Sequence, residues 1–298
     1  MTRWIDARRI AAFILLSAIW GTSWIAYYEI DGHCPPLRAA ALRYALAAVL
    51  LLAVAAIRRQ PWPRGSALRA MLVLGVTLVA LPFALLLWCA RTVPAGTQAV
   101  IFALTPIALV LMSSAGRMVP APRLAFYAAL GGFGGMVAAM SGALSFSLAH
   151  VAGLASVLLA VVCVTASLVF AKRELQASSP LFSAGIQLAV AALVLVGLSE
   201  VMERGRPSHW GSESLISLVL LSVLGSGVAL PLFYWLLQGW EAVQVGAVEW
   251  LQPLVSAAEG AALLHQPVPP TFLLGGLAVL CCTGVLLTST KEHDMSLS

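Results

Sequence analysis

Two stretches of the chain share residues at matching positions: residues 88–106 are WCARTVPAGTQAVIFALTP, and residues 235–253 are WLLQGWEAVQVGAVEWLQP. The shared positions pair at a constant offset of 147 residues, as Trp88/Trp235, Ala95/Ala242, Pro106/Pro253, Pro120/Pro267 and Pro122/Pro269. Pro36 and Pro180 open corresponding segments at a slightly shorter offset. The chain is therefore predicted to contain two copies of one unit.

The composition is that of a membrane protein. The chain is 61% hydrophobic and only 10% charged, whereas a soluble domain has roughly a quarter of charged residues. Apolar runs of about 20 residues, the length that crosses a hydrocarbon core, can be placed ten times. They cover 10–28, 37–57, 68–89, 95–114, 123–144, 152–170, 180–198, 215–237, 242–263 and 271–289. The predicted fold class is an all-α membrane protein with ten transmembrane helices.

The two copies are predicted to run in opposite directions, because each holds an odd number of spans. We expect a first five-helix repeat at 1–144, an external linker at 145–151, and a second five-helix repeat at 152–298 that ends in a short cytoplasmic tail. Many secondary transporters are built from inverted repeats, with one central site between the halves. Transport is the leading hypothesis at this stage.

The basic residues predict the orientation, because cytoplasmic loops carry an excess of Lys and Arg. One side receives Arg3, Arg8, Arg9, Arg58, Arg59, Arg64, Arg69, Arg117, Arg123, Lys172, Arg173 and Lys291, and the other only Arg38, Arg91, Arg204 and Arg206. Both termini are therefore expected in the cytoplasm. The net charge of +5 reflects this topology; with no nucleic-acid-binding motif beside a basic cluster, no nucleic-acid partner is expected.

Motifs for catalysis and cofactors are missing from the sequence. There is no P-loop, no HExxH and no GxSxG. The five histidines fall in predicted loops or tails, and the five cysteines show no metal-ligand spacing. We expect no enzymatic activity, no cofactor and no metal site.

The ninth predicted span carries the densest set of polar residues. Glu249, Gln252, Ser256 and Glu259 are spaced i, i+3, i+7 and i+10, which places them on one helical face. The 147-residue offset maps them onto Phe102, Thr105, Leu109 and Met112, with Gln98 one turn earlier on that face. The face of the ninth span would thus give a site one acidic and amide-bearing side, and the matching face of the fourth span an aromatic and apolar side. Such a site suits a zwitterion with an apolar or aromatic side chain.

Arg43 is a second polar candidate inside the membrane. It lies seven residues after Pro36, roughly 10 Å into the bilayer at 1.5 Å per residue. Its repeat counterpart is Gln187, and Glu259 is its candidate partner by depth. A structural role, in a fixed ion pair or by snorkelling, and a role in binding a substrate carboxylate both stay open.

Several aromatic residues lie deeper than the interfacial belt that Trp and Tyr usually form. The substrate-binding candidates are Trp20, Arg43, Tyr44, Phe83, Gln98, Phe102, Gln187, Glu249, Trp250 and Gln252. Prolines inside corresponding spans should kink their helices, and the hinge candidates are Pro82, Pro106, Pro231 and Pro253.

Gly131 and Gly135 form a GxxxG pattern in the fifth predicted span. Such small residues let helices approach closely, either in a dimer or within one chain. We favour packing within the chain and therefore expect a monomer, with a dimer as the alternative.

The order of motifs resembles the drug/metabolite transporter superfamily, in its ten-span branch of two EamA-type repeats. The resemblance rests on Trp20-Gly21-Thr22-Ser23-Trp24, Pro36 with Arg43, Pro106, the basic linker 117–123 before Gly131, and Pro180, Pro253 and Pro267 in the second copy. The second copy departs from the pattern, since it lacks the Trp-Gly pair and has Gln187 in place of the arginine.

Within that superfamily the chain is most similar to aromatic amino acid exporters of the YddG type. This resemblance implies a multi-pass protein of the bacterial inner membrane that exports aromatic and other neutral amino acids by alternating access. Its partners would be a small-molecule substrate and membrane lipids. A broad drug or lipid-carrier exporter stays open as an alternative, and so does a membrane-embedded enzyme.

Overall fold

The computed structural model describes residues 7–30, 33–90, 92–115, 122–144, 151–264 and 268–289. Within these ranges the chain is helical, and no strand occurs. Nearly all of the predicted linker (145–150), the two ends of the chain, and Pro120 and Pro267 of the repeat lie outside the described residues.

The N-terminal half contains helices over all five of its predicted spans. They are α1 (Ala7–Ile30), α2 (Pro36–Ile57), α3 (Gly65–Leu74), the π-helical η1 (Gly75–Ala80), α4 (Leu81–Cys89), α5 (Ala95–Phe102), α6 (Thr105–Ala115), α7 (Arg123–Ala139) and the short 3₁₀ turn η2 (Ser141–Ala143). The fifth span is shorter than the predicted 123–144, because the α-helix ends at Ala139.

The C-terminal half repeats this series. Its elements are α8 (Val151–Glu174), α9 (Pro180–Met202), α10 (Ser212–Leu220), the π-helical η4 (Leu221–Val228), α11 (Ala229–Gly239), α12 (Ala242–Gly246), α13 (Val248–Leu264) and α14 (Pro270–Ser289).

Among the described residues, seven helical segments are long and apolar enough to cross a membrane. They are Pro36–Ile57, Gly65–Cys89, Ala95–Ser113, Val151–Glu174, Pro180–Met202, Ser212–Gly239 and Pro270–Ser289, and Arg123–Ala139 is a shorter apolar helix. The chain is therefore a multi-pass helical membrane protein. The full count of ten spans stays a prediction.

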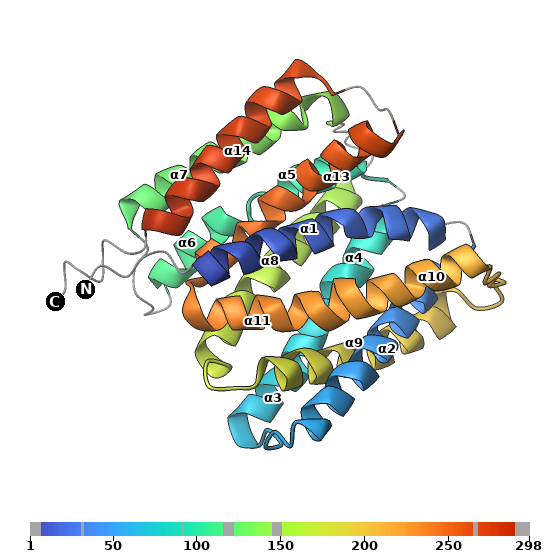
Figure 1. The fold of residues 1–298 in the computed structure, drawn as a ribbon. Coiled ribbons are helices and arrows are strands. Elements are labelled where there is room, and N and C mark those ends of the chain that lie inside the picture. The colour runs from blue at the N-terminus through green and yellow to red at the C-terminus, as the bar shows by residue number, and fades with distance from the viewer. Residues whose placement is uncertain are drawn as a thin grey trace.

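Corresponding helices of the two halves pack against each other. The pair α2–α9 forms one end of the stack and the pair α7–α14 the other, with α1 and α8 between them (Figure 1). On the α1 side, α1 contacts α13 and α11, and on the α8 side, α8 contacts α6 and α4. These contacts correspond across the repeat, so each half supplies equivalent helices to the interface.

Glycines allow the close approach of α7 and α14. An added Cβ on Gly135 would lie 2.9 Å from the Gly275 carbonyl oxygen, and one on Gly275 would lie 2.4 Å from the Gly135 carbonyl oxygen. A Cβ on Gly131 would meet the Cys282 sulfur at 2.8 Å. The GxxxG face is thus used for packing within the chain, as the preferred interpretation of the sequence expects.

Side chains join α2 and α9 at both ends of the pair. At one end the Glu203 carboxylate accepts hydrogen bonds from the backbone N–H groups of Leu37 (2.9 Å) and Arg38 (3.0 Å). These are two of the N–H groups that a helix N-terminus leaves without intrahelical partners. At the other end the Ser179 hydroxyl contacts the Gln60 amide oxygen. The two helices are therefore tied together across the full length of their contact.

Two π-helical turns accompany the prolines of the third and eighth spans. The element η1 directly precedes α4, which holds Pro82, and η4 directly precedes α11, which holds Pro231. After η4 the Ala229 N–H bonds to the Leu224 carbonyl, five residues back. Because proline has no N–H and clashes with the preceding turn, a widened turn accommodates it. The predicted distortions thus take the form of matched π turns.

The fourth and ninth spans are broken, whereas the sequence predicts continuous helices over 95–114 and 242–263. The first break lies between α5 and α6, just before Pro106, and the second lies at Ala247 between α12 and α13. Pro253 stays inside α13, so it does not cause the second break. There Gly246 packs closely on α6, where an added Cβ would lie 2.5 Å from Leu109 Cδ1.

The glycine contact predicts a difference between neighbouring substitutions on α7. Gly135→Ala should destabilise the protein by about 1–3 kcal/mol, the usual cost of overpacking, because the obstructing atom is a backbone oxygen. Gly134→Ala is the matched control, since no atom lies within 4 Å of its added Cβ. Thermal unfolding in detergent measures both variants; equal melting temperatures would contradict the close α7–α14 contact.

Candidate functional site

Arg43 lies on α2 and is 6% exposed. Its Nε donates a hydrogen bond of 2.8 Å to the hydroxyl of Ser226 on η4. An added Cβ on Gly225 would lie 2.8 Å from Arg43 Nη2, so the missing side chain of this glycine makes room for the guanidinium. The π-helical turn η4 of the eighth span therefore accommodates the buried guanidinium of Arg43.

Trp20 reaches the same turn from α1. Its Nε1–H donates to the Gly225 carbonyl at 3.1 Å, and its ring centroid lies 5.7 Å from that of Phe233. Trp20 and Arg43 thus contact adjacent residues of η4 from two different helices.

Aromatic rings complete this group. Tyr44 follows Arg43 on α2, and the guanidinium carbon lies 5.4 Å from its ring centroid. The Tyr44 ring meets Phe83 of α4 edge to face, with centroids 5.7 Å apart. We call Trp20, Arg43, Tyr44, Phe83 and Ser226 the Arg43 cluster; it joins four spans of the bundle.

Glu249 and Gln252 form a second polar group, in the first turns of α13. The Gln252 amide donates a hydrogen bond of 3.1 Å to Glu249 Oε2. Both side chains are only half-buried. A carboxylate is favourable in the first turn of a helix, where backbone N–H groups carry partial positive charge. The break at Ala247 creates this helix start within the ninth span.

Both polar groups involve helices that pack on α1. Gly21, next to Trp20 in the chain, packs on α13: an added Cβ there would lie 2.5 Å from Val255 Cβ and 3.3 Å from the Gln252 carbonyl oxygen. In Figure 1, α1 runs between α13 on one side and α10 and α11 on the other. Trp20 of the Arg43 cluster and Gly21, which packs on α13, are thus neighbours on α1.

Gln98 and Phe102 lie on α5, the first part of the broken fourth span. The Gln98 amide donates to the Val93 carbonyl at 2.8 Å. Both side chains are half-buried, and Phe102 packs on the edge of the core. They keep accessible surface, as residues beside a solute pathway would.

Trp250 and Gln187 are fully enclosed. The Trp250 indole donates to the Ala103 carbonyl at 3.0 Å, and its ring lies against Gly132, where an added Cβ would be 2.4 Å away. Gln187 accepts a hydrogen bond from the Tyr234 hydroxyl (2.6 Å) and donates one to the Ser183 carbonyl (2.6 Å). These contacts are those of side chains that hold helices together.

The predicted candidates thus fall into separate groups. The structure joins Trp20, Arg43, Tyr44 and Phe83, and it joins Glu249 with Gln252. Sequence reasoning missed Ser226, although a polar residue inside the eighth span is itself a signal. It also missed Gly225, which no pattern distinguishes from other glycines.

The described residues offer no obvious metal site. Among them, His, Cys, Asp and Glu side chains form no group of three or more that could hold a metal ion.

These features define a helical membrane protein with polar groups at the junction of two similar halves. The model of the EamA-like transporter family matches the chain twice, at residues 8–141 and 151–290. The chain belongs to this family, and it is a membrane transporter by that membership.

Curated relatives agree with this assignment. Over 292 residues the chain is 24% identical to the "Uncharacterized transporter YvbV" of Bacillus subtilis, covering 95% of this chain and 91% of that protein. It is 32% identical over 103 residues to "Protein PagO" of Salmonella typhimurium, and this match spans only 34% of either protein. A solved crystal structure superposes with a TM-score of 0.78 at 18% identity, over 97% of this chain and 99% of the other. That likeness shows the fold alone.

The enclosure of Trp250 predicts that its removal damages the fold. Trp250→Ala should cost about 3–5 kcal/mol, as for other large aromatic side chains in a core. Trp250→Phe keeps most of the ring and should cost less. Thermal unfolding of the purified variants measures both, and a Trp250→Ala protein as stable as the wild type would contradict the structural role of the indole.

Proposed function

We propose that this transporter exports small metabolites, chiefly aromatic and other neutral amino acids, by alternating access across the inner membrane. The single observation that carries the substrate class is the Arg43 cluster, a buried guanidinium among aromatic rings; the Glu249 carboxylate lies on α13, which also packs on α1.

The charges favour a zwitterion. Ionisable groups inside a membrane protein are costly and usually serve a partner or a substrate. The Arg43 guanidinium can bind a carboxylate in a bidentate manner, and Glu249 with Gln252 supplies acceptors for an ammonium group. A permeant organic cation would need Glu249 but not Arg43, so the presence of both groups favours amino acids over cationic drugs.

The aromatic surface favours apolar side chains. Trp20, Phe83 and Phe102 are half-buried and keep accessible ring surface, and aromatic pairs add about 0.5–1.5 kcal/mol beyond the burial of their area. A phenyl or indole side chain of a substrate would gain such contacts. Small hydrophilic solutes would gain little from them.

The matched distortions of the two halves support alternating access. The third and eighth spans have π turns, and the fourth and ninth are broken. Discontinuous helices near the repeat interface commonly form the sites of secondary transporters. If the halves have opposite orientation, the same bending in each half would open opposite sides of the membrane in turn.

The charge model predicts the behaviour of two variants in proteoliposomes. Arg43→Gln and Glu249→Gln should each lower the efflux of labelled phenylalanine about tenfold or more, because a hydrogen bond to a charged group contributes about 1.5–3 kcal/mol. Arg69→Gln and Glu213→Gln remove exposed charges and should leave flux unchanged.

Folding is checked by thermal unfolding and helical circular dichroism of each variant. Loss of flux in folded Arg43→Gln and Glu249→Gln supports the proposal. Normal flux in both would exclude these charges from the site. If the wild-type protein transports no phenylalanine but shows saturable flux of cationic drugs, the alternative function of a drug exporter is supported instead.

The prolines beside the π turns give a separate prediction. Pro82→Ala and Pro231→Ala restore a backbone N–H and favour a regular α-helical turn, so each should slow flux while phenylalanine binding is retained. Pro269→Ala, outside the helices, is the control. Unchanged flux in both span variants would show that the turns shape the bundle without moving.

A further inference from the structure

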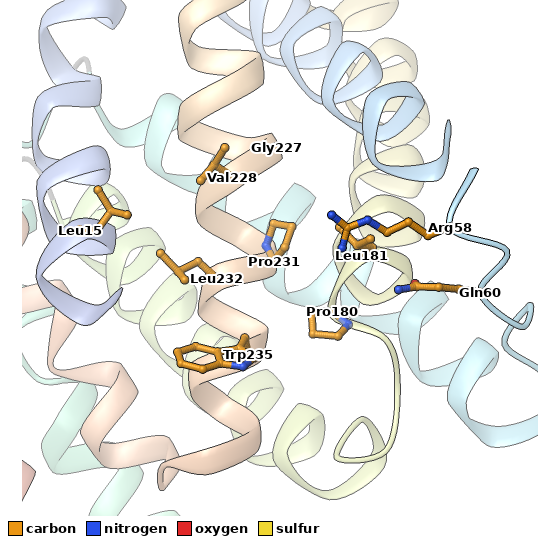
Figure 2. Close-up of a pocket in the computed structure, with 10 residues that line it drawn as sticks. All are labelled: Leu15, Arg58, Gln60, Pro180, Leu181, Gly227, Val228, Pro231, Leu232 and Trp235. Atoms are coloured by element: carbon orange, nitrogen blue, oxygen red, sulfur yellow. The ribbon is translucent and has the colours of Figure 1, made fainter. Parts of the chain in front are cut away.

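A groove lies along the eighth span, and its lining includes none of the residues of the Arg43 cluster. It has a volume of about 400 Å³ and is lined by Leu15, Arg58, Gln60, Pro180, Leu181, Gly227, Val228, Pro231, Leu232 and Trp235. In Figure 2, Leu15 of α1 and Arg58 at the end of α2 lie on opposite sides of Pro231. The groove therefore runs from α1 across α11 to the ends of α2 and α9.

The surface of the groove is mostly apolar and is accessible from outside the protein. Leu15 is 50% exposed, Val228 41% and Trp235 36%. All three lie on apolar helices that are expected to be embedded in lipid. An aqueous solute has no route to such a face, whereas an acyl chain of the bilayer lies directly against it.

Two guanidinium groups lie at or beside the groove. Arg58 is exposed and follows directly after α2. Arg9 of α1 lies beside another lining residue, with its guanidinium carbon 5.7 Å from the Trp235 ring centroid. Indole rings of Trp prefer the headgroup level of a bilayer, so Trp235 indicates that this part of the groove lies at the membrane surface. Basic pockets between transmembrane helices at that level suit anionic headgroups.

The geometry points to a binding site for one anionic phospholipid, with its phosphate at Arg58 and an acyl chain along Leu15, Val228 and Leu232. By the predicted orientation this lipid belongs to the cytoplasmic leaflet. The inference is independent of the transported substrate, since none of these residues belongs to the Arg43 cluster or to the Glu249–Gln252 pair.

Native mass spectrometry of the delipidated full-length protein tests this site. Dioleoylphosphatidylglycerol and dioleoylphosphatidylcholine serve as the anionic and the neutral probe. The wild type should bind its first phosphatidylglycerol more tightly than phosphatidylcholine. Arg58→Gln should weaken that binding about fivefold, since one basic side chain near the surface contributes about 1 kcal/mol to anionic lipid binding. Arg69→Gln, an exposed arginine on α3, is the charge-matched control.

A pair of α1 variants tests the apolar part of the groove. Leu15→Trp fills the groove and should lower the binding of both lipids, whereas Ile14→Trp changes the neighbouring residue, which is 59% exposed and does not line the groove. Equal binding of the two lipids by the wild type would overturn the proposal. So would Arg58→Gln matching Arg69→Gln, or Leu15→Trp matching Ile14→Trp.

Discussion

The structure depends on a requirement of the bilayer interior: backbone N–H and C=O groups there need partners inside the protein. The broken fourth span leaves such groups at its break, and the indole of Trp250 bonds the Ala103 carbonyl there. The two residues are 147 positions apart, so this bond joins equivalent points of the two copies. Because Glu249 directly precedes Trp250 in the chain, the bond between Trp250 and Ala103 also constrains where Glu249 lies.

In the eighth span, too, side chains of other helices bond to an irregular part of a helix, here in the Arg43 cluster. A π turn replaces the regular ladder at η4, and Trp20 binds a carbonyl of that turn while Arg43 binds a hydroxyl there. Distortions that proline imposes on the helices thus become the places where side chains of other spans attach. Polar groups of the candidate site consequently gather at the irregular parts of the bundle, and the regular helices around them supply apolar packing.

Much of the fold follows from the sequence, because apolar runs and the repeat are local or periodic signals. The residues of the ninth-span stripe do share one helix. Pro82, Pro106 and Pro231 accompany distortions, whereas Pro253 lies inside the helix α13. The breaks at Ala103 and Ala247 were not predictable, because their stability depends on distant contacts. Nor was the Arg43–Ser226 bond, whose partners are 183 residues apart. The sequence predicts which residues share a face but not how far each helix is rotated against its neighbours, and that rotation encloses Trp250.

We propose that Arg43 binds the carboxylate of a transported amino acid and that Glu249 with Gln252 binds its ammonium group. Calorimetric binding of phenylalanine to the purified protein, compared with phenethylamine and 3-phenylpropionate, tests it most directly, since each analogue lacks one charged group. We predict that both analogues bind about tenfold or more weakly than phenylalanine, in line with the loss of a charged hydrogen bond. Binding of either analogue as tightly as phenylalanine would contradict the account.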